Sequence, residues 1–217
     1  MRTFGFPEFL FILQAAQWTL ALSAIAFVGG SVLGLIIALS RTSESKVARG
    51  AAMVFIQIFQ GTPLLLQLFL IFFGAPVLGL DINPWVAAGA ALVLNSAAFL
   101  GEIWRGCIEA IPRGQWEAAQ ALNLNYLSRM RFVVLPQAFK IALPPTVGYV
   151  VQIIKCTSLA AIIGFTEITR AGQIINNATF QPLQVFSTVA ALYFVICWPL
   201  SLLAAHMERK RARVLAR

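Results

Sequence analysis

The most chemically capable residues of this sequence stand together at Lys155, Cys156, Thr157 and Ser158, within a long apolar stretch. An ammonium group at membrane depth is energetically unfavourable, so a lysine in such a place is a functional candidate. The two hydroxyls beside it can donate and accept hydrogen bonds. We expect these residues to line a polar pathway. As alternatives, Lys155 extends to the membrane surface or pairs with Glu167 or a carbonyl, and the hydroxyls bond back to their own helix.

A second polar group lies in two earlier apolar stretches. Thr62 and Pro63 interrupt the first of them, because proline removes a backbone donor and frees a carbonyl one turn earlier. Irregular backbone at membrane depth is tolerated where protein or a water-filled cavity covers it. Asn95 and Glu102 bracket the inner half of the next stretch. We expect them in the pathway; a packing kink at Pro63 and a pair between Glu102 and Arg105 are the alternatives.

No reaction centre is recognisable among the remaining residues. The sequence has a single histidine, few acidic residues and no GxxxxGK[ST] loop for a nucleotide. Its three cysteines, Cys107, Cys156 and Cys197, lie far apart without CxxC spacing, so neither a metal site nor a disulfide framework is expected. We predict a chain that catalyses no reaction.

The composition predicts an all-α, polytopic membrane protein. Of 217 residues, 59% are hydrophobic and only 11% are charged, against about 25% charge in a typical soluble domain. A helix needs about 20 apolar residues to cross a bilayer. Five spans fit the uncharged stretches, at residues 18–39, 51–73, 84–101, 141–165 and 185–205. The early apolar run is too long for a cleaved signal peptide, so we interpret it as a retained first span.

Positive charge predicts the orientation of these spans. Thirteen of the sixteen lysines and arginines fall in three segments on one side of a five-span chain: the loop after the first span, residues 105–140, and the C-terminal tail. Such residues gather on the cytoplasmic side, so we expect the N-terminus outside and the C-terminus inside. Residues 74–83 and 167–182 are then outer loops. The net charge of +8 has this topological meaning, and no nucleic-acid partner is expected.

The inner segment at 105–140 is more patterned than a simple loop. Pro112 and Gly114 break the chain, and Gln115–Leu122 then holds helix formers with Trp116, Ala119 and Leu122 spaced to share one face. Asn123 can adopt the left-handed conformation that ends a helix. A second amphipathic piece runs from there to Leu135 and Pro136. Two short helices meeting at a corner would form a knob that fits a groove on a partner.

This segment resembles the EAA loop of ABC-importer permeases. The match comprises Glu117-Ala118-Ala119, then Leu122-Asn123, then Leu135-Pro136, with Asn123 in place of the usual glycine. Four further stretches are similar to polar amino-acid permeases: Gly61–Phe69, which contains Gln67, then Asn95–Gly106, Leu143–Pro145 and Lys155–Leu159. The chain is thereby identified as a member of the histidine/glutamine-type permease family.

The resemblance implies one permease domain over residues 1–217, with the fold of a type I ABC-importer transmembrane domain. It implies a bacterial inner-membrane complex of two permeases and two ATPases, fed by an external solute-binding protein. ATP and Mg²⁺ would bind the ATPases, and this chain would bind no cofactor. It further implies two sets of residues. The substrate pathway would be lined by Thr62, Pro63, Gln67, Asn95, Glu102, Lys155, Cys156, Thr157 and Ser158. Coupling to the ATPase would use Gln115, Glu117, Ala118, Ala119, Leu122 and Asn123.

Two departures from the family pattern bear on the substrate. Gln60 stands where the family often has arginine, and Cys156 where it often has aspartate. The lost acid weakens the case for a cationic cargo. A polar amino acid is expected; an opine, a cystine-like molecule or another small solute is the alternative. A stand-alone channel or proton-coupled carrier is a further alternative, but it would not need the knob. The chain shows no internal repeat, and secondary transporters commonly carry two related halves. A short five-span chain therefore requires a second permease, either another copy or a sister chain.

Overall fold

The computed structural model describes residues 3–215, with side chains as far as Arg211, and this part of the chain is all-helical. The elements in chain order are α1 (Phe6–Thr42), α2 (Lys46–Gly61), α3 (Leu64–Val77), α4 (Pro84–Glu109), α5 (Arg113–Ala121), α6 (Tyr126–Arg129), the π-helical turn η1 (Met130–Val134), α7 (Leu135–Cys156), the 3₁₀ segment η2 (Thr157–Ile163), α8 (Ile168–Thr179) and α9 (Pro182–Leu215). The predicted fold class is confirmed.

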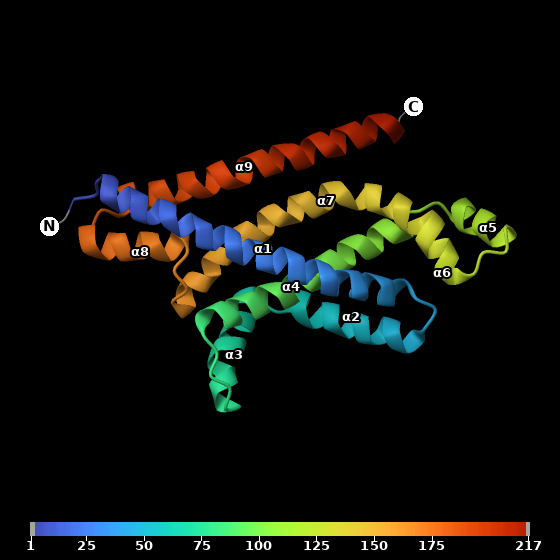
Figure 1. Cartoon of the computed structure of the whole chain (residues 1–217), viewed down its shortest axis with the longest axis horizontal. Coiled ribbons are helices and arrows are strands. Elements are labelled where there is room, and N and C mark those ends of the chain that lie inside the picture. Colours follow the sequence, from blue (N-terminus) through green and yellow to red (C-terminus); the bar gives the residue numbers. More distant parts are fainter. Residues whose placement is uncertain (1–2, 216–217) are drawn as a thin grey trace.

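Helices α1 and α4 form the closely packed centre of the molecule (Figure 1). Glycines permit this approach. A Cβ atom on Gly30 would lie 2.6 Å from Cβ of Ser96, and one on Gly101 would lie 2.7 Å from Cγ2 of Ile37. Small residues of this kind let transmembrane helices pack backbone to backbone. We call this contact the α1–α4 seam.

The second predicted span is broken. Helices α2 and α3 meet at Thr62 and Pro63 with a bend of 99°, and α3 projects away from the other helices in Figure 1. The interruption predicted at Thr62-Pro63 is confirmed, and it divides the second span into two separate helices. Proline leaves a carbonyl without its usual donor and prevents the helix from continuing through it.

The other helices extend beyond the predicted spans. Helix α1 begins at Phe6 instead of Trp18, because Glu8 accepts a hydrogen bond from the backbone N–H of Gly5 at 3.0 Å and so closes the first turn. Helix α4 starts at Pro84 but continues to Glu109, and α9 continues to Leu215. At 37 residues, α1 is about 55 Å long, well beyond the ~30 Å hydrocarbon core. The predicted spans therefore cover only part of each helix.

The second part of the knob and the fourth span form one continuous helical run, from Tyr126 to Ile163. The predicted fourth span, which starts at Ile141, is the later part of this run. The run contains the wide turn η1 directly before Pro136. Pro136 has no N–H for the carbonyl of Phe132, and its ring would clash with that carbonyl in a regular α-helix. The π turn relieves this clash without ending the helix.

The predicted outer loop at 167–182 is largely a helix, α8. Its asparagines and glutamines suggested a loop, but Ile168, Ala171 and Gly172 share a buried face. The Glu167 side chain accepts a hydrogen bond from the backbone N–H of Arg170 at 2.8 Å and caps the helix start.

The described residues contain four helices long and apolar enough to cross a membrane, or five spans if the bent α2–α3 pair counts as one. The turn between α1 and α2, the α5–α6 segment and the C-terminus gather at one end of the molecule (Figure 1). The N-terminus and α8 lie at the opposite end. The three basic segments therefore share an end, as the five-span topology requires.

Candidate functional site

Gln67 is the centre of a polar cluster at the break between α2 and α3. Its Nε2 donates to the carbonyl oxygens of Phe59, at 2.8 Å, and Thr62, at 3.0 Å, and contacts Thr62 Oγ1 at 2.9 Å. Asn95 Nδ2 on α4 donates to Gln67 Oε1 and to the Phe59 carbonyl, both at 3.2 Å. The two amides thus satisfy carbonyls that the broken helix leaves without backbone donors. We call Phe59, Thr62, Gln67 and Asn95 the α2–α3 joint.

A cavity of about 340 Å³ lies against this joint, between α2, α3, α4 and α7. It brings together three predicted pathway residues, Thr62, Asn95 and Cys156. Its full lining is Phe59, Gln60, Thr62, Leu64, Asn95, Phe99, Tyr149, Gln152 and Cys156. We call this space the polar cavity.

Sequence analysis missed Tyr149 and Gln152 as lining residues. Gln152 lies one helical turn before Cys156, and its Nε2 is 3.6 Å from Cys156 Sγ. Spacing of four residues places two side chains on the same helix face, so extending the Lys155–Ser158 group by one turn would have found Gln152. Gln60 was noted only as a departure from the family pattern.

The remaining residues of the Lys155–Ser158 group do not line the polar cavity. Lys155 is exposed and forms no ion pair with a described residue. Thr157 is fully buried and donates to the Ile154 carbonyl at 2.7 Å, while Ser158 donates to the Lys155 carbonyl at the same distance. Both hydroxyls therefore bond back to their own helix, which was the alternative interpretation.

Glu102 forms an ion pair one turn along its own helix. Arg105 Nε donates to Glu102 Oε2 at 2.9 Å, and the same guanidinium also contacts Glu109. For Glu102, as for the two hydroxyls, the structure agrees with the alternative interpretation, which was a pair with Arg105. Pro63 is exposed at the break and does not line the cavity. Gln67 does not line it either, but its side chain hydrogen-bonds to two lining residues, Thr62 and Asn95.

A buried carboxyl stands at the other end of the molecule, outside the membrane-spanning segments. Glu167 is fully buried, and its Oε2 accepts a 2.6 Å hydrogen bond from the hydroxyl of Tyr193 on α9. Burial raises the pKa of Glu167 above its ordinary value of 4.5. The next residue, Ile168, donates its backbone N–H to Thr19 Oγ1 on α1 at 3.3 Å. Glu167 and Ile168 together thus join α1, α8 and α9, and Glu167 is not a partner of Lys155.

The predicted coupling segment forms a short helix, α5, with an exposed surface. Gln115, Glu117 and Ala118 are exposed, whereas Ala119 is only 3% exposed and packs against its own chain. Leu122 is 75% exposed, so it does not share the buried face with Trp116 and Ala119 as the spacing suggested. The corner follows the prediction, because Asn123 has a φ of 55°.

This knob is fixed to the membrane helices at several points. The Tyr126 hydroxyl donates to the Thr42 carbonyl at the end of α1, at 3.1 Å. Gln137 on α7 donates to Gln115 Oε1 on α5 at 3.2 Å. These two hydrogen bonds connect α6 to α1 and α5 to α7.

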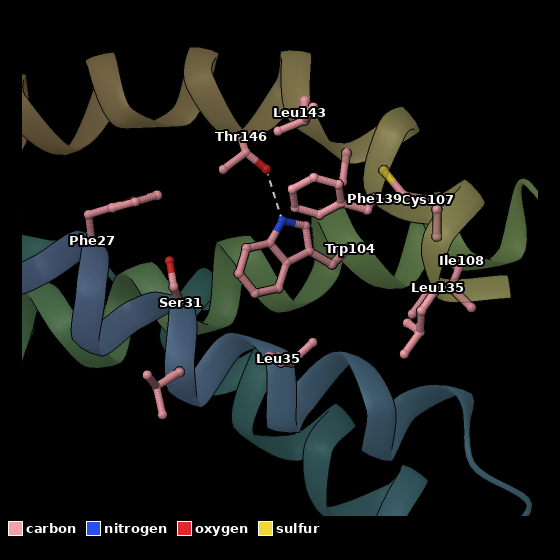
Figure 2. Close-up of a pocket in the computed structure, with 13 residues that line it drawn as sticks. Phe27, Ser31, Leu35, Trp104, Cys107, Ile108, Leu135, Phe139, Leu143 and Thr146 are labelled. Atoms are coloured by element: carbon pink, nitrogen blue, oxygen red, sulfur yellow. Dashed lines mark hydrogen bonds between the residues drawn. The ribbon is translucent and has the colours of Figure 1, made fainter. Parts of the chain in front are cut away.

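A second, larger cavity of about 680 Å³ lies between α1, α4 and α7 and is almost entirely apolar (Figure 2). Among the residues drawn in Figure 2, one hydrogen bond is present: Trp104 Nε1 donates to Thr146 Oγ1 at 2.9 Å. Ser31 Oγ, also in this lining, has no hydrogen-bond partner among the described residues. Such a lining cannot replace the hydration of a polar solute, so this cavity is a poor pathway candidate.

The family described as binding-protein-dependent transport system inner membrane component matches residues 30–213. The probable amino-acid ABC transporter permease protein YckA of Bacillus subtilis is 35% identical over 205 residues, covering 94% of this chain and 91% of that protein. The glutamine transport system permease protein GlnP of Escherichia coli is 36% identical over 206 residues, 94% of each chain. A crystal structure of an amino acid ABC transporter with histidines matches with a TM-score of 0.88 and 34% identity, covering 96% of this chain and 100% of that one.

Proposed function

Because the chain belongs to the family of binding-protein-dependent transport system inner membrane components, we propose that it is the permease subunit of an ABC importer for a polar amino acid. The resemblance found in the sequence is thereby confirmed, and so is the fold of a type I ABC-importer transmembrane domain. One observation carries the proposal. A polar cavity at a broken membrane helix and an exposed coupling helix occur in the same chain.

The substrate passes along the polar cavity at the α2–α3 joint. Thr62, Asn95 and Cys156 contact it, and Gln67 holds the joint in shape. Lys155 and Ser158, which lie outside this cavity, act at the interface with the second permease. Transport requires the two subunits to alternate between states that expose the site to opposite sides, with different affinity in each.

The energy for this change comes from partner subunits. Two ATPases bind ATP and Mg²⁺, and this chain hydrolyses nothing. Their closure moves α5, whose exposed residues Gln115, Glu117, Ala118 and Leu122 form the contact. Ala119 and Asn123 shape the helix and its corner. The chain pairs with a second copy or a sister permease, and a solute-binding protein delivers the cargo.

The chain lies in the bacterial inner membrane with its N-terminus outside and its C-terminus in the cytoplasm. The basic segments at one end of the molecule support this orientation. Reporter fusions at Ser43, at Gln120 and near the C-terminus should report cytoplasm, and a fusion near Asn177 should report the outside. Fusions at Gln120 and Asn177 on the same side would contradict the orientation.

The coupling role is tested on two neighbouring residues of α5. Ala118→Asp adds a charge to the exposed face, so the chain should reach the membrane at normal level but lose its ATPase in co-purification. Ala119→Asp places a carboxylate in a buried position, so it should weaken the knob itself. If Ala118→Asp retains normal ATPase binding and normal substrate-stimulated ATP turnover, α5 is not the dock.

The importer function itself is tested by uptake. The complete transporter, in proteoliposomes with its binding protein, should accumulate a labelled amino acid only when ATP is supplied. Uptake by this chain without an ATPase would instead establish the stand-alone carrier.

A further inference from the structure

We propose that Pro144 and Pro145 form a hinge in α7, between the knob and the polar cavity, and that Arg211 on α9 is a positioning residue that fixes the angle of this hinge. The inference rests on the proposed function, because it concerns how a movement of α5 reaches the substrate pathway. It gives a role to a proline pair and an arginine that neither the pathway nor the contact with the ATPase uses.

The first argument is the backbone of α7. In a regular α-helix, the N–H groups of residues 144 and 145 would donate to the carbonyls of Lys140 and Ile141. Both residues are prolines inside the helix, so these two donors are absent and each ring presses against the carbonyl one turn earlier. Helices bend most sharply at such positions, and α7 is curved in Figure 1. The proline pair is therefore the place where α7 can change its angle.

The second argument is the contact that replaces one of the missing donors. Arg211 Nη1 donates to the Ile141 carbonyl at 3.3 Å, and this carbonyl is the acceptor that Pro145 leaves without its backbone partner. A carbonyl in a membrane helix needs such a donor. The guanidinium is half-buried and forms no ion pair with a described residue. Its hydrogen bond to α7 is therefore not shared with a carboxylate.

The third argument is that the two parts of α7 are attached to different elements. After the hinge, Thr146 accepts a hydrogen bond from Trp104 on α4 at 2.9 Å (Figure 2), and the ring of Tyr149 stacks on that of Phe99 with centroids 5.5 Å apart. Before the hinge, α7 is hydrogen-bonded to α5. The part that lines the polar cavity is thus held by α4, and the part beside the knob is held by α5.

The apolar cavity provides the space that a hinge requires. Its volume is about 680 Å³, and its lining on α7 extends from Leu135 to Thr146, on both sides of the proline pair. Protein interiors are normally packed too densely for a helix to swing. A helix beside a cavity of this size can move without first displacing its neighbours.

These contacts give Arg211 a defined effect on transport. Its hydrogen bond stabilises the hinge angle of the conformation described here, and it lies outside the polar cavity and outside α5. Removing it makes the alternative angle easier to reach. In a two-state equilibrium, the loss of one hydrogen bond to a charged group raises the population of the minor state by on the order of tenfold.

Arg211→Met tests this effect in the complete transporter, reconstituted in proteoliposomes with its binding protein. ATP turnover without amino acid should rise by on the order of tenfold, because the conformation that the closed ATPases require becomes easier to reach. The ATP used per amino acid transported should rise with it. Arg211→Lys keeps a donor and should retain most of the coupling. Arg209→Met, at an exposed position of the same tail, should change neither quantity.

The direction of the change separates positioning from folding. A variant that is merely less stable would lose ATP turnover, whereas the loss of the positioning contact raises it. If ATP turnover without amino acid is unchanged or lower in Arg211→Met, Arg211 does not fix the hinge.

Pro145→Ala identifies the atom through which Arg211 acts. Alanine restores the backbone donor to the Ile141 carbonyl, so the side chain of Arg211 is no longer needed there. Adding Arg211→Met to Pro145→Ala should then change ATP turnover without amino acid by less than about twofold. If the two substitutions instead act independently of each other, Arg211 acts elsewhere and the proposed contact is overturned.

Replacing both Pro144 and Pro145 by alanine tests the hinge itself. The regular helix should lower the kcat of ATP-driven uptake by on the order of tenfold, while the ATPase still co-purifies because α5 is unchanged. Pro199→Ala, at another proline inside a membrane helix, is the matched control and should leave kcat unchanged. A normal kcat in the double variant overturns the hinge and leaves the importer function standing. Uptake that needs no ATP in the unmodified transporter removes the importer function, whatever the variants do.

Discussion

The α1–α4 seam and the α2–α3 joint hold the same molecule together by different physics. In the seam, glycines let two backbones approach so closely that a single added carbon would collide with Ser96 or Ile37. In the joint, side-chain amides replace backbone donors that the helix break removed. The packing of the seam depends on the absence of side-chain volume, and the structure of the joint depends on the presence of side-chain hydrogen-bond donors. The comparison indicates that the seam does not tolerate added volume and that the joint does not tolerate the loss of a donor.

The largest loss of stability is expected from the seam. Gly30→Ala would place Cβ 2.6 Å from Ser96 Cβ, and overpacking of this kind destabilises by about 1–3 kcal/mol. That corresponds to roughly 2–4 °C of Tm for each kcal/mol in a chain of this size. Thermal unfolding of the purified chain in detergent measures it. Gly148→Ala, where no atom lies within 4 Å, is the control and should not lower the Tm. Equal behaviour of the two variants would show that the seam is not limited by volume.

A smaller loss is expected from the joint. Gln67→Met keeps the length of the side chain but removes the donor to the Phe59 and Thr62 carbonyls. Asn95 still donates to the Phe59 carbonyl, so we expect a loss of about 0.5–1.5 kcal/mol, the net contribution of one hydrogen bond, and the lost shape of the joint should also abolish uptake. Tm and ATP-driven uptake are measured together. Gln14→Met, at an exposed position of α1, should change neither. If Gln67→Met transports normally, the joint does not organise the pathway.

A pH-dependent effect is expected at Glu167, which belongs to neither region. Its native pKa is raised above 4.5 by burial, so the folded chain binds the proton more tightly than the unfolded chain does. The stability contributed by this proton is present below pH 4.5 and is lost as pH rises through the raised native value. Glu167→Gln should remove that part of the slope, at most about 1.4 kcal/mol per pH unit. Unfolding of both proteins is followed across this range, and identical slopes would refute the assignment.

The smallest change in stability is expected at Lys155. Its side chain is exposed and forms no ion pair with a described residue, so Lys155→Met should alter stability by no more than about 0.5 kcal/mol. Uptake should nevertheless fall or change its substrate preference, because we propose that the residue acts at the subunit interface. A variant with normal uptake would exclude Lys155 from the pathway.

The sequence predicted those parts of the molecule that depend on local chemistry. The break at Pro63, the left-handed Asn123 and the pair of Glu102 with Arg105 all follow from residues within a few positions of each other. The ends of the helices could not be predicted in this way. An apolar stretch shows which residues can lie in the bilayer, but it does not show where the helix itself begins or ends. Helix α8 was missed because its apolar stripe is short and its polar face is rich in loop-forming residues.

The polar cavity was only partly predictable for a similar reason. Thr62, Asn95 and Cys156 were named from separate motifs, but which face of α7 approaches the joint depends on how the helices pack. Thr157 and Lys155 belong to the same motif as Cys156 and point elsewhere, because successive helical positions lie about 100° apart. A motif identifies a segment, and tertiary packing decides which of its residues reach the site.

The π turn at Met130–Val134 also affects how chain length can vary between related proteins. A π turn accommodates one residue more than an α turn over the same rotation. A relative lacking one residue between positions 130 and 134 would form a regular helix there and still present α5 on the same side of the molecule. One residue lost from the regular helix just beyond Pro136 would instead turn α5 by about 100° about the helix axis. Alignment gaps should therefore be common in the first stretch and rare in the second.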